Sequence, residues 1–114
     1  RQFFLHLVNP RLAPTGNDSD VCVMYNTVIG KKDGKPTRIE YFMWEGAADG
    51  FSGMARVTSF PAAIATIMVA AGRFDQRGIR APEECVTGDN YTYFMKELKK
   101  VNISISEKIS PVCE

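Results

Sequence analysis

Residues 21–44 read VCVMYNTVIGKKDGKPTRIEYFMW, and their pattern specifies the central element of the expected fold. From Val21 to Ile29 the side chains alternate between two faces, both largely apolar, which is typical of a strand in the interior of a sheet. The Asp33-Gly34 pair suits a tight hairpin turn because its residues tolerate positive φ. Residues 37–44 return as a second strand, so the pattern predicts a long β-hairpin.

Two helical patterns and a further strand follow the hairpin. Residues 61–71 are rich in alanine and almost wholly apolar, which predicts a helix that begins at Pro61, ends at Gly72 and is buried on several sides. An amphipathic helix is expected over residues 90–100 with Asp89 as its cap, and a last strand over residues 103–109. The sequence therefore predicts an α+β domain with a mostly antiparallel sheet, in which the long hairpin packs against the buried alanine-rich helix and the amphipathic helix.

The start of the chain indicates a piece of a larger protein. Phe4, Leu7 and Val8 have the spacing of a buried helix face, and Pro10 ends the pattern. The run opens at Arg1 with neither a methionine nor a capping residue, as a helix already under way would. We therefore expect residues 1–114 to be a single domain excised from a longer chain.

Size and composition exclude several classes of protein. A chain of 114 residues with a formal net charge of +1 fits one ordinary globular domain and lacks the charge expected for binding nucleic acid. No apolar run approaches the ~20 residues that span a bilayer. The three cysteines are far apart and the only histidine is His6, which favours reduced thiols in a cytoplasmic protein and no metal site.

Chemistry is most plausible just before the alanine-rich helix. Arg56, Thr58 and Ser59 place a guanidinium and two hydroxyls beside the unpaired amides expected at a helix N-terminus. A guanidinium matches a carboxylate through two parallel hydrogen bonds, so these three residues are candidate ligands for the carboxylate of an amino acid. The alternative is that Thr58 or Ser59 caps the helix and Arg56 forms a surface ion pair.

Other candidate groups have ordinary explanations. His6 has no recognisable nucleophile beside it, and the Glu83-Glu84 pair lies in a predicted turn where carboxylates are usually solvated. The glycines of residues 46–53 lack the spacing of a phosphate-binding loop. No residue is expected to act as a general acid or base.

The segment from Met54 to Ala65, MARVTSFPAAIA, resembles a signature of the saccharopine dehydrogenase and lysine dehydrogenase family. The resemblance continues through Gly72 and the run from Gly78 to Glu84, and nearly the whole chain follows the family's order of elements. Ser59 departs from the family pattern, in which a glycine stands at this position. The chain is thus similar to the C-terminal, substrate-binding and dimerisation domain of these enzymes.

The resemblance implies an oxidoreductase of amino-acid metabolism that acts on the amine-bearing carbon of lysine-like or saccharopine-like compounds. It implies a separate Rossmann domain that binds NAD or NADP. This chain lacks the G-x-G-x-x-G motif of such a domain, so the piece alone should bind no dinucleotide and catalyse nothing. It also implies a cytoplasmic homodimer whose partners are an amino-acid substrate and a second copy, with neither nucleic acid nor membrane. The alternative function is a stand-alone small-molecule-binding or oligomerisation module.

Overall fold

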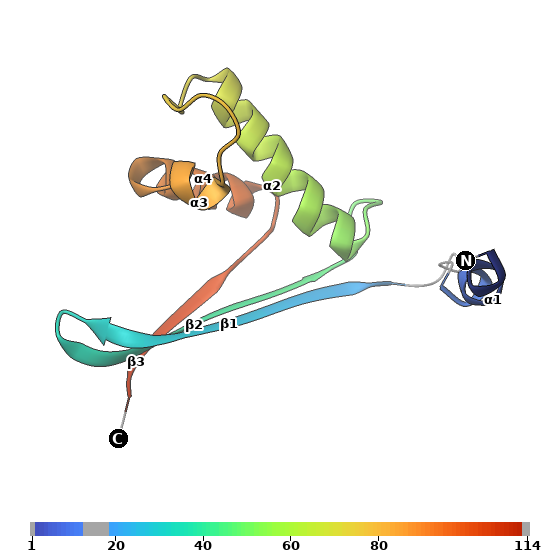
Figure 1. Ribbon diagram of the computed structural model, residues 1–114, viewed down its shortest axis with the longest axis horizontal. Coiled ribbons are helices and arrows are strands. Elements are labelled where there is room, and N and C mark those ends of the chain that lie inside the picture. The colour runs from blue at the N-terminus through green and yellow to red at the C-terminus, as the bar shows by residue number, and fades with distance from the viewer. Residues whose placement is uncertain (1, 13–18, 113–114) are drawn as a thin grey trace.

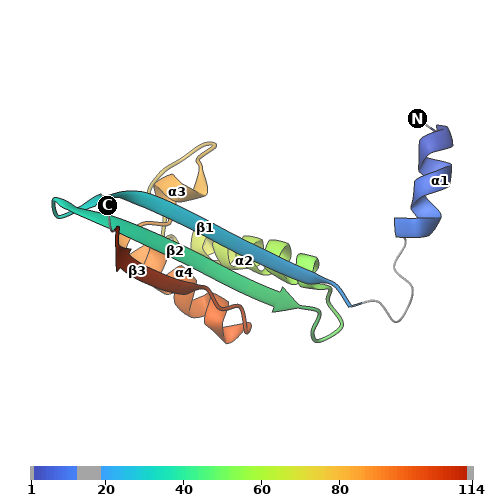
Figure 2. The same cartoon turned by 90° about the horizontal axis from the view of Figure 1, so that it is seen from below.

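The computed structural model describes residues 2–12 and 19–112. In chain order they form α1 (Gln2–Leu12), β1 (Val21–Lys32), β2 (Lys35–Gly46), α2 (Gly53–Ala70), α3 (Pro82–Cys85), α4 (Gly88–Lys100) and β3 (Ser106–Pro111). The strands make one antiparallel sheet in the order β1-β2-β3. Helices α2, α3 and α4 all lie on one side of this sheet (Figures 1 and 2). The predicted α+β class with an antiparallel sheet is confirmed.

The predicted hairpin forms, but its first strand is not interior. Lys32 pairs with Lys35 across a turn in which Asp33 and Gly34 take φ values of 52° and 75°. Gly34 thus supplies the left-handed conformation that the turn requires. In the described part of the chain β2 is the middle strand and β1 an edge, so the predicted interior position is wrong. Apolar residues line both faces of β1 for another reason, since the helices cover one face and leave the other open.

Helix α2 begins eight residues before the predicted start at Pro61. Ser52 caps it, with its hydroxyl accepting a hydrogen bond from the Ala55 amide at 3.0 Å. Because the first turn is satisfied in this way, Pro61 lies inside the helix and the predicted boundary is wrong. The helix is also less buried than its composition suggests. Its buried residues share one face, and they are Gly53, Arg56, Ile64 and Met68.

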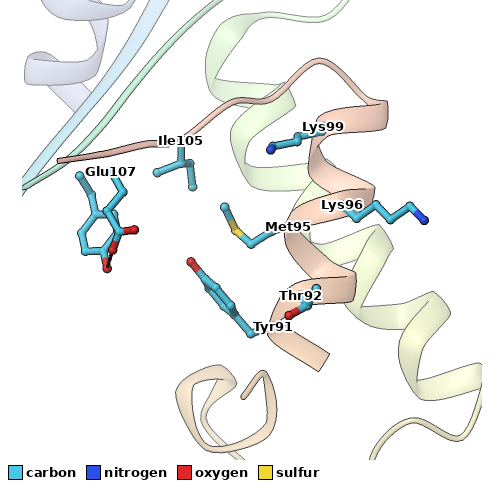
Figure 3. Close-up of a pocket in the computed structure, with 8 residues that line it drawn as sticks. Tyr91, Thr92, Met95, Lys96, Lys99, Ile105 and Glu107 are labelled. Atoms are coloured by element: carbon cyan, nitrogen blue, oxygen red, sulfur yellow. Dashed lines mark hydrogen bonds between the residues drawn. The ribbon is translucent and has the colours of Figure 1, made fainter. Parts of the chain in front are cut away.

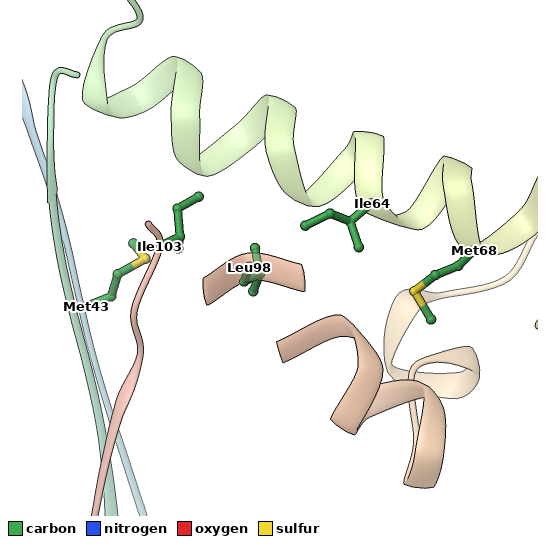
Figure 4. Packing of buried hydrophobic residues seen from close by; sticks show 5 residues of the cluster. All are labelled: Met43, Ile64, Met68, Leu98 and Ile103. Carbon is green, nitrogen blue, oxygen red and sulfur yellow. The ribbon is translucent and has the colours of Figure 1, made fainter. Parts of the chain in front are cut away.

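A small apolar core joins the helices to the sheet (Figure 4). Its buried members come from β2, α2, α4 and the segment before β3, and they are Met43, Ile64, Met68, Leu98 and Ile103. Met68 is the most enclosed, with 0% of its surface exposed. Helix α2 contacts β1, β2 and α4, so this single helix holds the sheet and α4 together.

By length and composition alone α2 would also pass as a membrane span, yet its packing on the core and its buried Arg56 fit a core helix.

The remaining elements depart from expectation mainly at their ends. Helix α4 is confirmed, but its cap is Thr87 and Asp89 lies within the first turn. The last strand begins at Ser106, later than predicted. Helix α1 continues through Pro10, and it lies apart from the sheet in both views (Figures 1 and 2). Phe4 is exposed there, so its predicted burial is not found.

One face of the sheet carries no helix. In Figure 2 the strands lie in front of α2, α3 and α4, and this front face is open. A continuous group of its exposed apolar side chains comes from β1 and β2, and consists of Val21, Val23, Tyr25, Phe42 and Trp44. We call this set the open sheet face. Trp44 is 58% exposed, and the cross-strand pairs Val23–Trp44 and Tyr25–Phe42 make the patch continuous.

Close contact between α2 and the sheet leads to the first prediction. A Cβ atom on Gly53 would lie 2.7 Å from the Glu45 carbonyl oxygen and 3.2 Å from the Asp20 carbonyl oxygen. Since both neighbours are backbone atoms, Gly53→Ala should lower the free energy of unfolding by about 1–3 kcal/mol in urea melts. Gly30→Ala is the matched control, because a Cβ there meets nothing within 4 Å. Equal stability of the two variants would refute the close packing.

Candidate functional site

The N-terminus of α2 already holds an anion from its own chain. The carboxylate of Asp20 accepts hydrogen bonds from the Gly53 amide at 2.6 Å and the Met54 amide at 2.9 Å. The amides of Ala55 and Arg56 donate to Ser52. Each amide from Gly53 to Arg56 therefore has an acceptor within the chain, so none of these four is free to bind a substrate anion.

The Asp20 contacts predict a pH dependence of stability. Hydrogen bonds from the Met54 and Gly53 amides lower the pKa of Asp20 from its ordinary value. A carboxyl whose pKa is lower in the folded state stabilises the fold above the unfolded-state pKa, and this stabilisation is lost as pH falls through the folded pKa. We expect Asp20→Asn to reduce the melting temperature at neutral pH and to make it less sensitive to acid below about pH 4. Parallel acid profiles for variant and parent would contradict this assignment.

Arg56 lies at the centre of a buried polar cluster. Its Nη1 donates to Glu45 Oε2 at 3.2 Å and to the Gly46 carbonyl at 2.7 Å. Its Nη2 donates to two carbonyls in the turn after α4, those of Val101 at 3.3 Å and Asn102 at 3.0 Å. Arg56 therefore joins the end of β2 to the end of α4, and we call this set the Arg56 clamp.

Glu45 completes the clamp from the sheet. Its Oε1 accepts a hydrogen bond from the Ser104 amide at 2.9 Å, while Oε2 faces Arg56. Arg56 and Glu45 are only 5% and 7% exposed. A buried ion pair with this many hydrogen bonds is compensated for its desolvation. The ion pair foreseen for Arg56 does form, but in the interior and not at the surface.

Thr58 and Ser59 point their hydroxyls back at their own helix. Thr58 Oγ1 donates to the Met54 carbonyl at 2.7 Å, and Ser59 Oγ donates to the Ala55 carbonyl at 2.5 Å. Both side chains are exposed and neither caps the helix. The three predicted ligands thus lie close together on α2, but Arg56 is buried while Thr58 and Ser59 lie on the exposed surface of the helix.

A second polar cluster lies in a cleft between α4 and the sheet (Figure 3). The cleft has a volume of about 440 Å³. Its lining comes from β2, α4, β3 and the segment before β3, and consists of Tyr41, Tyr91, Thr92, Met95, Lys96, Lys99, Ile105 and Glu107. We call it the α4 cleft. It combines charged groups of both signs with an apolar floor, which is typical of a site for a small polar ligand.

Tyr41 and Glu107 form the sheet side of the α4 cleft. They are register partners on β2 and β3, and the Tyr41 hydroxyl donates to Glu107 Oε1 at 2.8 Å. This hydrogen bond, burial and the charge of Glu107 raise the pKa of Tyr41 above its ordinary value. The phenol therefore stays protonated at neutral pH and holds the carboxylate of Glu107 in place.

The α4 cleft continues into a larger apolar cavity. This cavity, of about 680 Å³, shares Tyr41, Tyr91, Met95 and Ile105 with the cleft. It extends between α2 and α3, where Ala62, Ala65 and Pro82 line it. A ligand with a polar end and an apolar end could thus place the first in the α4 cleft and the second in the apolar cavity.

The other interacting titratable groups of the described residues lie at the surface. Glu40 accepts a hydrogen bond from the Tyr25 hydroxyl and pairs with Arg38 at 3.5 Å on the sheet. Glu84 pairs with Arg80 at 3.9 Å, and both side chains are exposed. His6 lies on α1, away from the sheet and both polar clusters (Figure 1). Cys22 and Cys85 are free thiols, and Cys113 lies outside the described residues. Within residues 2–12 and 19–112 no three His, Cys, Asp or Glu side chains gather as metal ligands would.

The family of this domain follows from comparison with known protein families. A family model described as the saccharopine dehydrogenase C-terminal domain matches residues 1–103. The chain belongs to this family. No solved structure matches it significantly. Membership in the saccharopine dehydrogenase family associates the domain with oxidoreductases of amino-acid metabolism. The match includes Arg56, Glu45 and most of the lining of the α4 cleft, but Ser104, Ile105 and Glu107 follow it in the chain.

Proposed function

We propose that this chain is the substrate-binding and dimerisation domain of an oxidoreductase that uses NAD or NADP. The substrate is a lysine-like or saccharopine-like amino acid, and the reaction takes place at its amine-bearing carbon. The family match over residues 1–103 carries this proposal. The α4 cleft supports it, because the domain offers a pocket lined by charges of both signs.

The nicotinamide cofactor belongs to another part of the parent protein. The chain has no G-x-G-x-x-G run, and the N-terminus of α2, where a pyrophosphate would otherwise be favoured, already holds Asp20. The residues described therefore do not fit a dinucleotide. No hydride-transfer step is assigned to them.

A substrate-binding role for Arg56, Thr58 and Ser59 stays a prediction. It requires Arg56 to leave Glu45 and three carbonyls, and it requires the two hydroxyls to leave the carbonyls of α2. The geometry favours the structural alternative for Arg56.

The free thiols of Cys22 and Cys85 support a reducing, cytoplasmic location.

The open sheet face supports the homodimer. Five apolar side chains are exposed together on two paired strands, and contiguous apolar patches of this kind mark interaction sites. The sequence predicts self-association through two faces of the second strand, Tyr41/Met43 and Phe42/Trp44. Met43 faces the core and Tyr41 lines the α4 cleft, so only the Phe42/Trp44 face remains available.

The dimer predicts the effect of a charge on this face. Trp44→Glu should weaken self-association at least about tenfold, or ~1.4 kcal/mol, in sedimentation equilibrium, because the dimer would bury an unpaired carboxylate. Ile79→Glu is the matched control, since Ile79 is fully exposed in the segment before α3. A monomeric parent at high micromolar concentration, or equal effects of both variants, would refute this interface.

The proposed activity is tested on the protein at its full natural length. Lysine-like and saccharopine-like amino acids are supplied with NAD or NADP, and formation of the reduced nicotinamide is followed by absorbance. Turnover with at least one amino acid supports the oxidoreductase. A protein that binds these compounds or assembles without any hydride transfer would support the alternative, a small-molecule-binding or oligomerisation module.

A further inference from the structure

We propose that the α4 cleft binds a small zwitterion in which an amine and a carboxylate are joined by a short aliphatic body. The inference rests on the proposed substrate-binding role and names the place and the chemistry of that binding. Three features carry it: a cation on α4, an anion on the sheet, and an apolar floor between them (Figure 3).

Lys99 is the group for the carboxylate. Figure 3 shows its ammonium directed toward the space above Met95 and Ile105. Lys96 also lines the cleft, but its ammonium is directed away from Met95 in the same view. Lys99 has no carboxylate within ion-pair distance in the described part of the chain, whereas the neighbouring Lys100 is paired with Glu97 at 2.6 Å. An ammonium without a protein partner beside a cavity is suited to an incoming carboxylate.

Glu107 is the group for the amine. One of its oxygens accepts the hydrogen bond from Tyr41, which holds the carboxylate in place on β3. A carboxylate has about four lone-pair positions, so this bond leaves several for the hydrogens of an ammonium. In Figure 3 the Glu107 carboxylate and the Tyr91 hydroxyl both lie at the border of the space opposite Lys99.

The floor selects an aliphatic body between the two charges. Met95 and Ile105 lie between Lys99 and Glu107, and they continue into the cavity lined by Ala62 and Ala65. Methylene groups placed there are removed from water, which is worth about 0.8 kcal/mol for each fully buried CH₂. A doubly charged ligand without an aliphatic body would leave Met95 and Ile105 in contact with water.

The test uses the full-length protein and three probes in isothermal titration. They are ε-aminocaproate, which has both charges, caproate, which has only the carboxylate, and hexylamine, which has only the amine. Lys99→Gln should weaken ε-aminocaproate and caproate at least tenfold and leave hexylamine unchanged. Glu107→Gln should weaken ε-aminocaproate and hexylamine at least tenfold and leave caproate unchanged. Lys100→Gln is the matched control and should change none of the three.

The result that overturns the inference is equal affinity of ε-aminocaproate for the parent, Lys99→Gln and Glu107→Gln. Absence of binding to the parent would overturn it too. Melting temperatures of the variants within a few degrees of the parent show that lost binding is not lost folding. Hydride transfer in the same variants separates the two proposals: turnover with unchanged KM in Glu107→Gln would retain the oxidoreductase and remove the α4 cleft as its substrate site.

Discussion

Replacing Arg56 by alanine is expected to lower the free energy of unfolding by about 3–5 kcal/mol. The variant leaves Glu45 buried without its cation and leaves three carbonyls, those of Gly46, Val101 and Asn102, without their donor. Removing one partner of a buried ion pair leaves the other charge buried without compensation. This is among the most destabilising changes known for a single side chain. Chemical denaturation monitored by the fluorescence of Trp44 measures the effect.

Two controls separate this structural role from a general loss of charge. Arg80→Ala removes an arginine from an exposed pair with Glu84, and should change stability by less than about 1 kcal/mol. Arg56→Met combined with Glu45→Leu removes both buried charges and should recover only the part of the loss caused by the unpaired Glu45, because the three carbonyls and the Ser104 amide still lack their partners. If Arg56→Ala were as stable as Arg80→Ala, Arg56 would be free to bind a ligand and the clamp would be wrong.

Met68→Ala is expected to destabilise the domain by about 2–5 kcal/mol. Met68 is fully enclosed where α2 packs on the core, and its truncation leaves a cavity that a small core cannot close by collapse (Figure 4). Met54→Ala is the matched control on the same helix, since Met54 is 57% exposed and should lose less than about 1 kcal/mol. Equal urea midpoints for the two variants would contradict the position of the core.

The hairpin could be predicted because its signals are local. Alternation from Val21 to Ile29, the Asp33-Gly34 turn and the returning strand all depend on neighbours in the chain. The amphipathic α4 is predictable for the same reason. These elements suffice for the α+β class.

The first residue of α2 could not be predicted from the neighbouring sequence, because the residue that stabilises this helix end is distant in the chain. Asp20 lies more than thirty residues before Gly53 and Met54, yet it accepts hydrogen bonds from both amides. Pro61 therefore resembles a helix start although it lies within the helix. The position of β1 at an edge likewise depends on where β3 pairs, which alternation along β1 does not show.

The candidate site shows the same limit. The sequence singles out Arg56 as a candidate ligand for a carboxylate, but its contacts depend on Glu45 and on the turn after α4, which only the fold brings together. Tyr41 and Glu107 are sixty-six residues apart and become neighbours through the register of β2 and β3. A tyrosine and a glutamate on strands carry no signal by themselves, so the α4 cleft could not be anticipated.

The most direct test of the substrate-side role is hydrogen exchange on the full-length protein with and without its amino-acid substrate. We expect slower exchange in β2, β3 and α4 when the substrate is bound, because these elements line the α4 cleft. Residues 30–36 at the end of the hairpin line neither the α4 cleft nor the apolar cavity, so they serve as the internal reference and should exchange at the same rate in both states. Turnover of the substrate with no change of exchange anywhere in residues 19–112 would contradict the assignment of this domain to the substrate.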